Sequence, residues 1–199
     1  MAALGLAMAV PFRGFSMGGA APAPTYATWN PADIGTQLSL SNGDLTVTGG
    51  GSWRTVRATI GRNSGKPEFE VTVGIAGGTD NVIGTCTALE SLQNYIGFSA
   101  QGWGYYGPTG AQVHNTAQTA FGASYGADVL TFSFDFTADT VLVKKNGASQ
   151  GTFDISSLNG DVFFPAASPF NNGNTATLNA GQTALLYPET GYEGSWAQL

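Results

Sequence analysis

The segment from Tyr125 to Gly151 constrains the fold more than any other, because it contains consecutive strand patterns separated by two tight turns. Residues 129–136 combine aromatic and β-branched side chains, which favour strands. Ala138-Asp139 predicts a chain reversal, and residues 140–144 supply the returning strand. Asn146-Gly147 is a strong hairpin signal, because both residues tolerate positive φ. The segment therefore predicts a β-meander.

The composition agrees with an all-β chain. The 199 residues include 29 glycines, and only 10% of them are charged, which suits many short strands joined by tight turns. No long segment keeps a helical period; the only short helical turn that we expect is Cys86 to Leu92, where Ala88, Leu89 and Leu92 share one side. The length allows a two-sheet core. Cys86 has no cysteine partner in the sequence, and its surroundings predict a small buried apolar residue.

The meander resembles the core of the SPRY (B30.2) domain, a concanavalin-like sandwich. The family series Gly-Asp-Val-Ile-Gly, Leu-Asp and Lys-Asn-Gly corresponds here to Gly126-Ala-Asp-Val-Leu130, Phe134-Asp135 and Lys145-Asn-Gly147. Other family-like segments follow in the same order: Ser52 to Arg57, Ser64 to Val73, Ile96-Gly97-Phe98, Trp103 to Tyr106, Val113-His114-Asn115, Phe164 to Ser168 and Thr177 to Gly181. The resemblance spans roughly residues 37–182 and implies an antiparallel two-sheet β-sandwich of the jelly-roll kind over residues 25–184.

The aromatic residues near the middle of the chain are the candidate ligand surface. Residues 100–115 interleave Trp103, Tyr105 and Tyr106 with glycines, and such aromatics can stack on a sugar or anchor a protein. In the SPRY family, loops at one end of the sandwich form the ligand surface. We expect Trp103 and Tyr106 to be exposed; the alternative is an inward Tyr105 on a strand. The predicted surface residues are Trp103, Tyr105, Tyr106, His114 and Asn172. Two departures from the family, Pro67 for an aromatic and Ala180 for Phe, affect this surface more than the fold.

The first 24 residues predict an arm that extends from the sandwich. Residues 1–17 are apolar apart from Arg13, lack a positive segment before the apolar run, and are interrupted by Pro11, which argues against a signal peptide. A run of about ten residues is also too short for a bilayer, which takes roughly 20. A Gly/Ala/Pro spacer follows, so we expect an anchor that docks on a partner; the alternative is an extra strand on its own sandwich. The predicted anchor residues are Leu4, Leu6, Met8, Val10, Phe12 and Phe15.

The arm also resembles the short Gly-Leu and Pro-Phe peptides that begin many structural proteins of tailed bacteriophages, through Leu4-Gly5-Leu6 and Pro11-Phe12. Arm and sandwich together imply a virion structural protein that docks on capsid, portal or tail components. The sandwich would then be displayed as decoration, fibre or host-recognition module, touching a host-surface glycan or protein, and we expect a homo-oligomer. The alternative is a free carbohydrate- or protein-binding lectin-like module. Residues 185–199 form a C-terminal extension that covers an open edge or meets a partner subunit.

The acidic residues of one predicted strand raise the question of catalysis. Glu68 and Glu70 lie two apart, so both carboxylates share a face, as in the nucleophile and helper of a sandwich glycosidase. The third acidic residue that such enzymes carry is replaced here by Thr72 or Val73. We therefore predict no catalytic residue, no enzyme activity and no cofactor.

Charge and turn composition argue against other ligand classes. The net charge is −6 and the seven basic residues are scattered, which disfavours nucleic acid; Arg54, Arg57 and Arg62 come nearest to a cluster, and we expect them on a solvated face. Turns such as Asn42-Gly43-Asp44 lack the acidic density of a calcium site, so no metal site is predicted.

Overall fold

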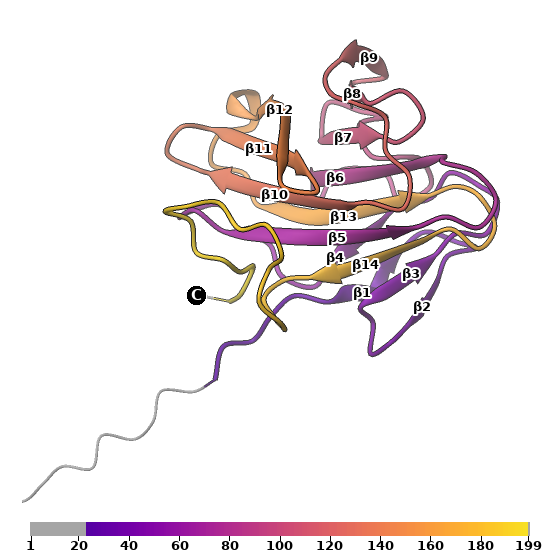
Figure 1. The fold of residues 1–199 in the computed structure, drawn as a ribbon, viewed down its shortest axis with the longest axis horizontal. Coiled ribbons are helices and arrows are strands. Elements are labelled where there is room, and N and C mark those ends of the chain that lie inside the picture. The colour runs from indigo at the N-terminus through magenta and orange to yellow at the C-terminus, as the bar shows by residue number, and fades with distance from the viewer. Residues whose placement is uncertain (1–22, 199) are drawn as a thin grey trace, which may run out of the picture.

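Two antiparallel sheets face each other across an apolar core in the computed structural model, which describes residues 23–198 (Figure 1). Each sheet has seven strands within these residues, and this confirms the predicted all-β sandwich. The proposed anchor residues, Leu4, Leu6, Met8, Val10, Phe12 and Phe15, lie outside the described residues.

We name each sheet after a central strand. The β6 sheet runs in the order β1 (Trp29–Ile34), β4 (Val56–Ala58), β13 (Phe163–Pro169), β6 (Asn81–Thr87), β7 (Gly102–Tyr106), β8 (Ala111–His114) and β9 (Ala117–Ala120). The β5 sheet runs in the order β12 (Ala148–Asp154), β11 (Thr140–Lys145), β10 (Val129–Asp135), β5 (Glu68–Gly74), β14 (Thr175–Asn179), β3 (Thr46–Thr48) and β2 (Ser39–Ser41). A single 3-10 turn, η1 (Ser156–Leu158), follows β12.

The predicted meander is confirmed as β10, β11 and β12. The β10–β11 turn contains Asp139 with φ 53°, and the β11–β12 turn contains Asn146 and Gly147 with φ 48° and 82°. Positive φ at both central residues matches the right-handed twist of the flanking strands, which explains why the Asn-Gly pair marks this hairpin.

The core is built from aromatic side chains of the two sheets and of the C-terminal segment. Phe69 stacks on Phe132, with ring centroids 4.9 Å apart, and meets the edge of Trp196 at 5.5 Å. The indole nitrogens of Trp29 and Trp196 donate hydrogen bonds to Ala176 O and Ile60 O, so both rings are buried without an orphaned donor.

Residues 184–198 form the C-terminal strap, which passes along the outer face of the β5 sheet at Leu186 to Glu189 and then turns inward, where Trp196 joins the core. Glu68 and Glu70 point to this face, as the strand period predicts, yet both side chains are buried. The Glu70 carboxylate accepts the backbone N–H groups of Leu186 and Tyr187 at 2.8 and 2.7 Å. The two carboxylates therefore fix the strap to the sheet.

Two local predictions are wrong. Cys86 lies inside β6 and not in a helical turn, because Cys86 fills a small apolar cluster on the outer face, while Leu89 stands in the following turn with 79% of its surface exposed. The predicted solvated arginine face is also absent from the described residues. Arg57 is buried and pairs with Asp33 at 2.7 Å, and Arg62 is buried and pairs with Glu193 at 3.0 Å.

Candidate binding site

A row of glycines shapes the outer face of the β6 sheet. Gly84 and Gly104 lie opposite each other on β6 and β7. A Cβ atom on Gly104 would stand 2.2 Å from Val82 Cγ1 and 3.0 Å from the Ile96 carbonyl oxygen. The absence of side chains here lets the β6–β7 loop lie directly on the sheet, with Ile96 buried in the same cluster as Cys86. The neighbouring Tyr95 is thereby held above the sheet surface.

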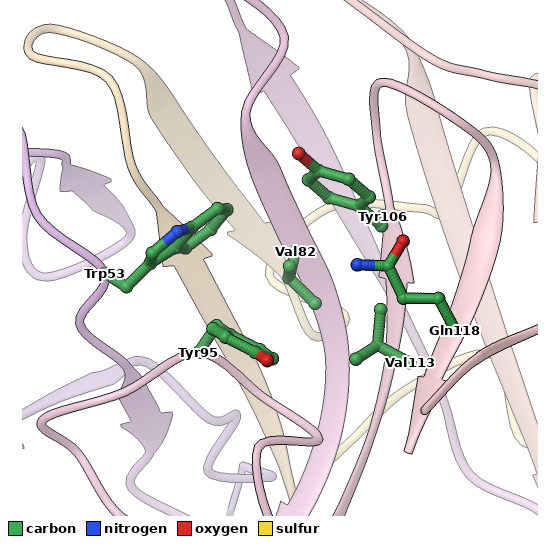
Figure 2. Close-up of a pocket in the computed structure, with 6 residues that line it drawn as sticks. All are labelled: Trp53, Val82, Tyr95, Tyr106, Val113 and Gln118. Carbon is green, nitrogen blue, oxygen red and sulfur yellow. The ribbon is translucent and has the colours of Figure 1, made fainter. Parts of the chain in front are cut away.

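Beside this loop the outer face forms a pocket of about 120 Å³ (Figure 2). Its floor and rim come from β6, β7, β8 and β9, from the β6–β7 loop and from the loop before β4. The lining residues are Trp53, Val82, Tyr95, Tyr106, Val113 and Gln118. Trp53 meets the rings of Tyr95 and Tyr106 edge to face, with centroids 5.5 and 6.1 Å apart, and also contacts Phe170 at 4.8 Å. These contacts hold the aromatic wall in place.

The pocket carries polar groups that are free to bind a ligand. Within residues 23–198 the Trp53 indole N–H, the Tyr95 hydroxyl and the Gln118 amide make no hydrogen bond to the protein. Figure 2 shows the Gln118 amide directed toward Val82 at the centre of the pocket. Tyr106 instead donates its hydroxyl to Asp80 Oδ1 at 2.7 Å. Burial first, and then this hydrogen bond, raise the pKa of Tyr106 to about 12, so the phenol stays neutral.

The pleat of β7 separates the predicted aromatic residues. Trp103 and Tyr105 point into the core, with 2% and 0% of their surfaces exposed, whereas Tyr106 points outward and lines the pocket. The prediction that Trp103 is exposed is wrong, because a regular strand places it on the same side as Tyr105. The inward alternative for Tyr105 is confirmed, and Tyr106 is half-buried at the pocket wall.

The two other predicted residues do not line the pocket. His114 stacks on Trp103 with centroids 4.1 Å apart and an interplanar angle of 16°, and its Nδ1 lies 2.9 Å from Gly102 O. Asn172 is exposed in the turn between β13 and β14. Sequence reasoning missed Trp53 and Tyr95. Trp53 stands alone among glycine and polar residues, and Tyr95 precedes the apolar Ile96-Gly97-Phe98 segment. The glycine pair under the β6–β7 loop is the signal that could have drawn attention to them.

A second groove, of about 310 Å³, lies on the outer face of the β5 sheet beside the C-terminal strap. It is lined mainly by threonines and leucines, and its buried carboxylate, Glu70, already binds the strap. The smaller pocket is the better candidate site, because only it combines an aromatic wall with free hydrogen-bond donors. In residues 23–198 there is no cluster of three metal-ligating side chains, and no helix is long and apolar enough to cross a bilayer.

Fold and pocket together define a class of protein: an antiparallel two-sheet sandwich that presents an aromatic pocket on the outer face of one sheet. The sequence profile of the SPRY domain matches residues 66–183. The chain belongs to the SPRY domain family. SPRY domains in general bind protein partners, so the family places this chain among protein-interaction modules.

Two curated relatives match most of this chain over part of their own length. Ran-binding protein 9 of Xenopus tropicalis is 27% identical over an alignment of 202 positions, and the alignment covers 94% of this chain and 36% of that protein. Ran-binding protein 9 of Xenopus laevis is 26% identical over an alignment of 188 positions, which covers 87% of this chain and 33% of that protein. The chain thus spans about a third of the length of these relatives.

Solved structures share the fold. The TRIM65 PSpry domain superposes with a TM-score of 0.62 at 18% identity, covering 77% of this chain and 92% of that domain. The SPRY domain of human HERC1 superposes with a TM-score of 0.63 at 18% identity, covering 78% of this chain and 99% of that one. Stonustoxin gives a TM-score of 0.64 at 18% identity over 77% of this chain and 27% of the toxin chain.

Proposed function

We propose that this chain is a non-enzymatic binding module that captures one apolar side chain of a protein partner in the pocket around Val82. The aromatic wall made by Trp53, Tyr95 and Tyr106 carries this proposal, because aromatic pockets of this kind anchor binding hot spots. The volume of about 120 Å³ lies well below the roughly 300–1,000 Å³ of small-molecule sites, so it suits a single side chain. The free donors at the rim would bind the partner backbone.

The titratable side chains support a role without catalysis. The carboxylates of Glu68 and Glu70 are buried and accept N–H groups of the C-terminal strap, so both are engaged by the chain itself. Cys86 and His114 lie on opposite faces of the β6 sheet, so the imidazole is not placed to activate the thiol. The pKa of the Cys86 thiol is raised to about 12, mainly because the thiol is buried. The thiolate form that a nucleophile requires is therefore disfavoured.

Peptide selection tests the proposal. The full chain is immobilised and exposed to a displayed library of random peptides of about twelve residues. Peptides enriched on the wild type should bind Trp53→Ala at least about tenfold more weakly, because the central ring of the aromatic wall is lost. Leu89→Ala, which truncates an exposed apolar side chain elsewhere, is the matched control and should bind normally. Equal binding by Trp53→Ala, or no enriched peptide, contradicts the proposed function.

A host-surface glycan is the second candidate ligand, because Trp53 and Tyr95 offer ring faces and free donors of the kind that sugars engage. The two classes are separated by screening the same variants on a glycan array. Glycan binding that disappears in Trp53→Ala, without any peptide binding, would favour the lectin-like function.

The setting that we propose for this module is the virion of a tailed bacteriophage, where residues 1–24 dock on capsid, portal or tail proteins and a homo-oligomer displays the sandwich. The apolar sequence of the arm supports this proposal. Gradient sedimentation of a lysate should show the full-length chain migrating with large particles and a chain without residues 1–24 remaining at the top. Co-migration of both forms would contradict anchoring by the arm, and recovery of both at the top would contradict the virion setting.

A further inference from the structure

The edge strand β9 differs from the other sheet edges in residues 23–198. β1 contains Pro31 and Asp33 and pairs irregularly with β4, the β11–β12 pairing carries a register shift, and β2 has only three residues. Such features prevent a sheet edge from pairing with another chain. β9 has a regular register with β8, carries neither charge nor proline, and has four exposed residues. As far as residues 23–198 show, its outer edge is therefore open to a further strand.

The hydrogen-bond pattern shows which backbone groups of β9 are free. Gly107 N–H donates to Asn81 O, so Gly107 directs its backbone N–H to β6. Every second residue of an antiparallel strand faces the same neighbour, so Tyr105, which pairs with Ile83, also directs its backbone groups to β6. Because antiparallel strands alternate the direction of these groups, Tyr106 directs its own to β8, where it pairs with Ala111. The next β8 residue, Gln112, must then face β9.

The same alternation continues into β9. Gln112 pairs with Thr119 and His114 pairs with Ala117, so these two β9 residues bond to β8. The backbone N–H and C=O groups of Gln118 and Ala120 consequently point away from the sheet, and within the described residues they have no partner.

Gln118 joins this free edge to the candidate pocket. Its backbone groups point outward along the sheet, while its side chain lies on the outer face and lines the pocket with Val113 and Tyr106 (Figure 2). A strand laid along β9 would therefore run beside the pocket opening. No Asp, Glu, Lys or Arg occurs between Glu90 and Asp128, so the strands β7, β8 and β9 carry no charged side chain on a chain of net charge −6. Asp80 lies next to the pocket wall, where its carboxylate accepts the Tyr106 hydroxyl at 2.7 Å.

We propose that β9 pairs with an extended, uncharged peptide segment of the partner protein, which adds a strand to the β6 sheet and inserts an apolar side chain into the pocket. This inference rests on the proposed function and gives the ligand its conformation and chemistry. A partner peptide fits better than a second copy of this chain. Four residues span only about 13 Å, and pairing two such edges would bury far less than the roughly 1,200 Å² of a stable interface. A peptide paired with β9 gains further affinity by inserting a side chain into the pocket, which the edge-to-edge pairing of two copies would not provide.

A proline substitution tests the edge separately from the pocket. Ala120→Pro removes an outward N–H that β8 does not use, so the sheet should remain intact while the edge loses one donor. The peptide enriched by selection on the full wild-type chain should bind Ala120→Pro at least about tenfold more weakly. Ala120→Val keeps the N–H and is the matched control, with affinity expected within about threefold of the wild type.

Hydrogen exchange on the unmodified chain provides a readout that does not depend on how Ala120→Pro folds. The amides of Gln118 and Ala120 should exchange rapidly in the free chain and become protected when the peptide binds. If these amides stay unprotected while binding still requires Trp53, the edge inference is overturned and the pocket remains. If no peptide depends on Trp53, the proposed function fails and this inference fails with it.

Discussion

The backbone N–H of Glu189 donates a 2.8 Å hydrogen bond to the buried carboxylate of Glu68. Ser133 donates its hydroxyl to the same oxygen, Oε1, at 2.6 Å, whereas Oε2 is buried with no hydrogen-bond partner within the described residues. An acidic side chain on the outer face of a sheet is thus used to hold a chain segment rather than to meet solvent. This arrangement has a measurable dependence on pH.

The pKa of Glu68 is raised, mainly because the carboxyl group is buried. The folded chain therefore binds a proton at Glu68 more tightly than the unfolded chain does. The contribution of Glu68 to stability therefore grows as the pH falls toward about 4.3, the pKa of an unperturbed glutamate. Glu68→Gln removes this titration. The stability of the variant minus that of the wild type should therefore be higher at neutral pH than near pH 5, because only the wild type gains stability as the pH falls. Urea unfolding at both pH values measures the difference. Asp161→Asn, at an exposed position, is the control, and a pH-independent difference for Glu68→Gln would contradict the prediction.

Glu68→Ala should destabilise the fold at every pH. It leaves the Glu189 N–H and the Ser133 hydroxyl without their acceptor, and each orphaned buried group costs about 1–3 kcal/mol. We expect a loss of about 2 kcal/mol or more in the unfolding free energy, together with faster proteolysis of the C-terminal strap. A strap that is cleaved as slowly as in the wild type would show that Glu68 does not fasten it.

Gly84→Ala should disrupt the sheet beneath the β6–β7 loop. The new Cβ would stand 2.0 Å from the Trp103 carbonyl oxygen, which is backbone and cannot turn away. We expect a loss of about 3 kcal/mol in thermal or urea unfolding. Gly126→Ala is the matched control, because its Cβ would lie 3.9 Å from Thr79 and should change stability by no more than about 0.5 kcal/mol. Equal stability of the two variants would refute the packing argument.

Tyr106→Phe separates the two roles of this residue. The variant loses the 2.7 Å hydrogen bond to Asp80, which should lower the unfolding free energy by about 1 kcal/mol. The ring remains in the pocket wall, so peptide affinity should stay within about twofold of the wild type. A large loss of affinity in titration calorimetry would indicate that the hydroxyl itself contacts the ligand.

The Cys86 thiol should be inert in the folded chain. It is fully buried, and its pKa, raised by burial to about 12, keeps it protonated at about pH 8. A disulfide reagent at that pH should label the chain only after denaturant is added. Rapid labelling of the native chain would mean that the apolar cluster on the outer face opens readily.

The sequence pattern was sufficient for the elements that depend on local chemistry. The Asn146-Gly147 hairpin, the shared face of Glu68 and Glu70 and the burial of Cys86 follow from turn preferences and from the two-residue period of strands. Those rules act between neighbours in the chain and need no knowledge of the remaining structure.

The pocket could not be predicted in the same way, because its wall joins residues that are distant in the sequence. Trp53 and Tyr95 meet only because the glycines of β6 and β7 allow a loop to settle on the sheet. The face taken by Trp103 depended on whether residues 102–106 form a regular strand or a loop, and the glycines around it favoured the wrong choice. The buried partners of Arg57 and Arg62 likewise come from segments far along the chain.

Ala27 N–H donates to Trp196 O at 3.1 Å, and Gln198 N–H donates to Thr25 O at 2.9 Å, so the chain enters and leaves the sandwich at one place. In Figure 1 this place is at the lower left, and β7, β8 and β9 lie at the upper right. Because these two segments are adjacent, the domain can be inserted into a loop of a larger protein without separating the two ends of that loop. A host attached there leaves the pocket facing outward.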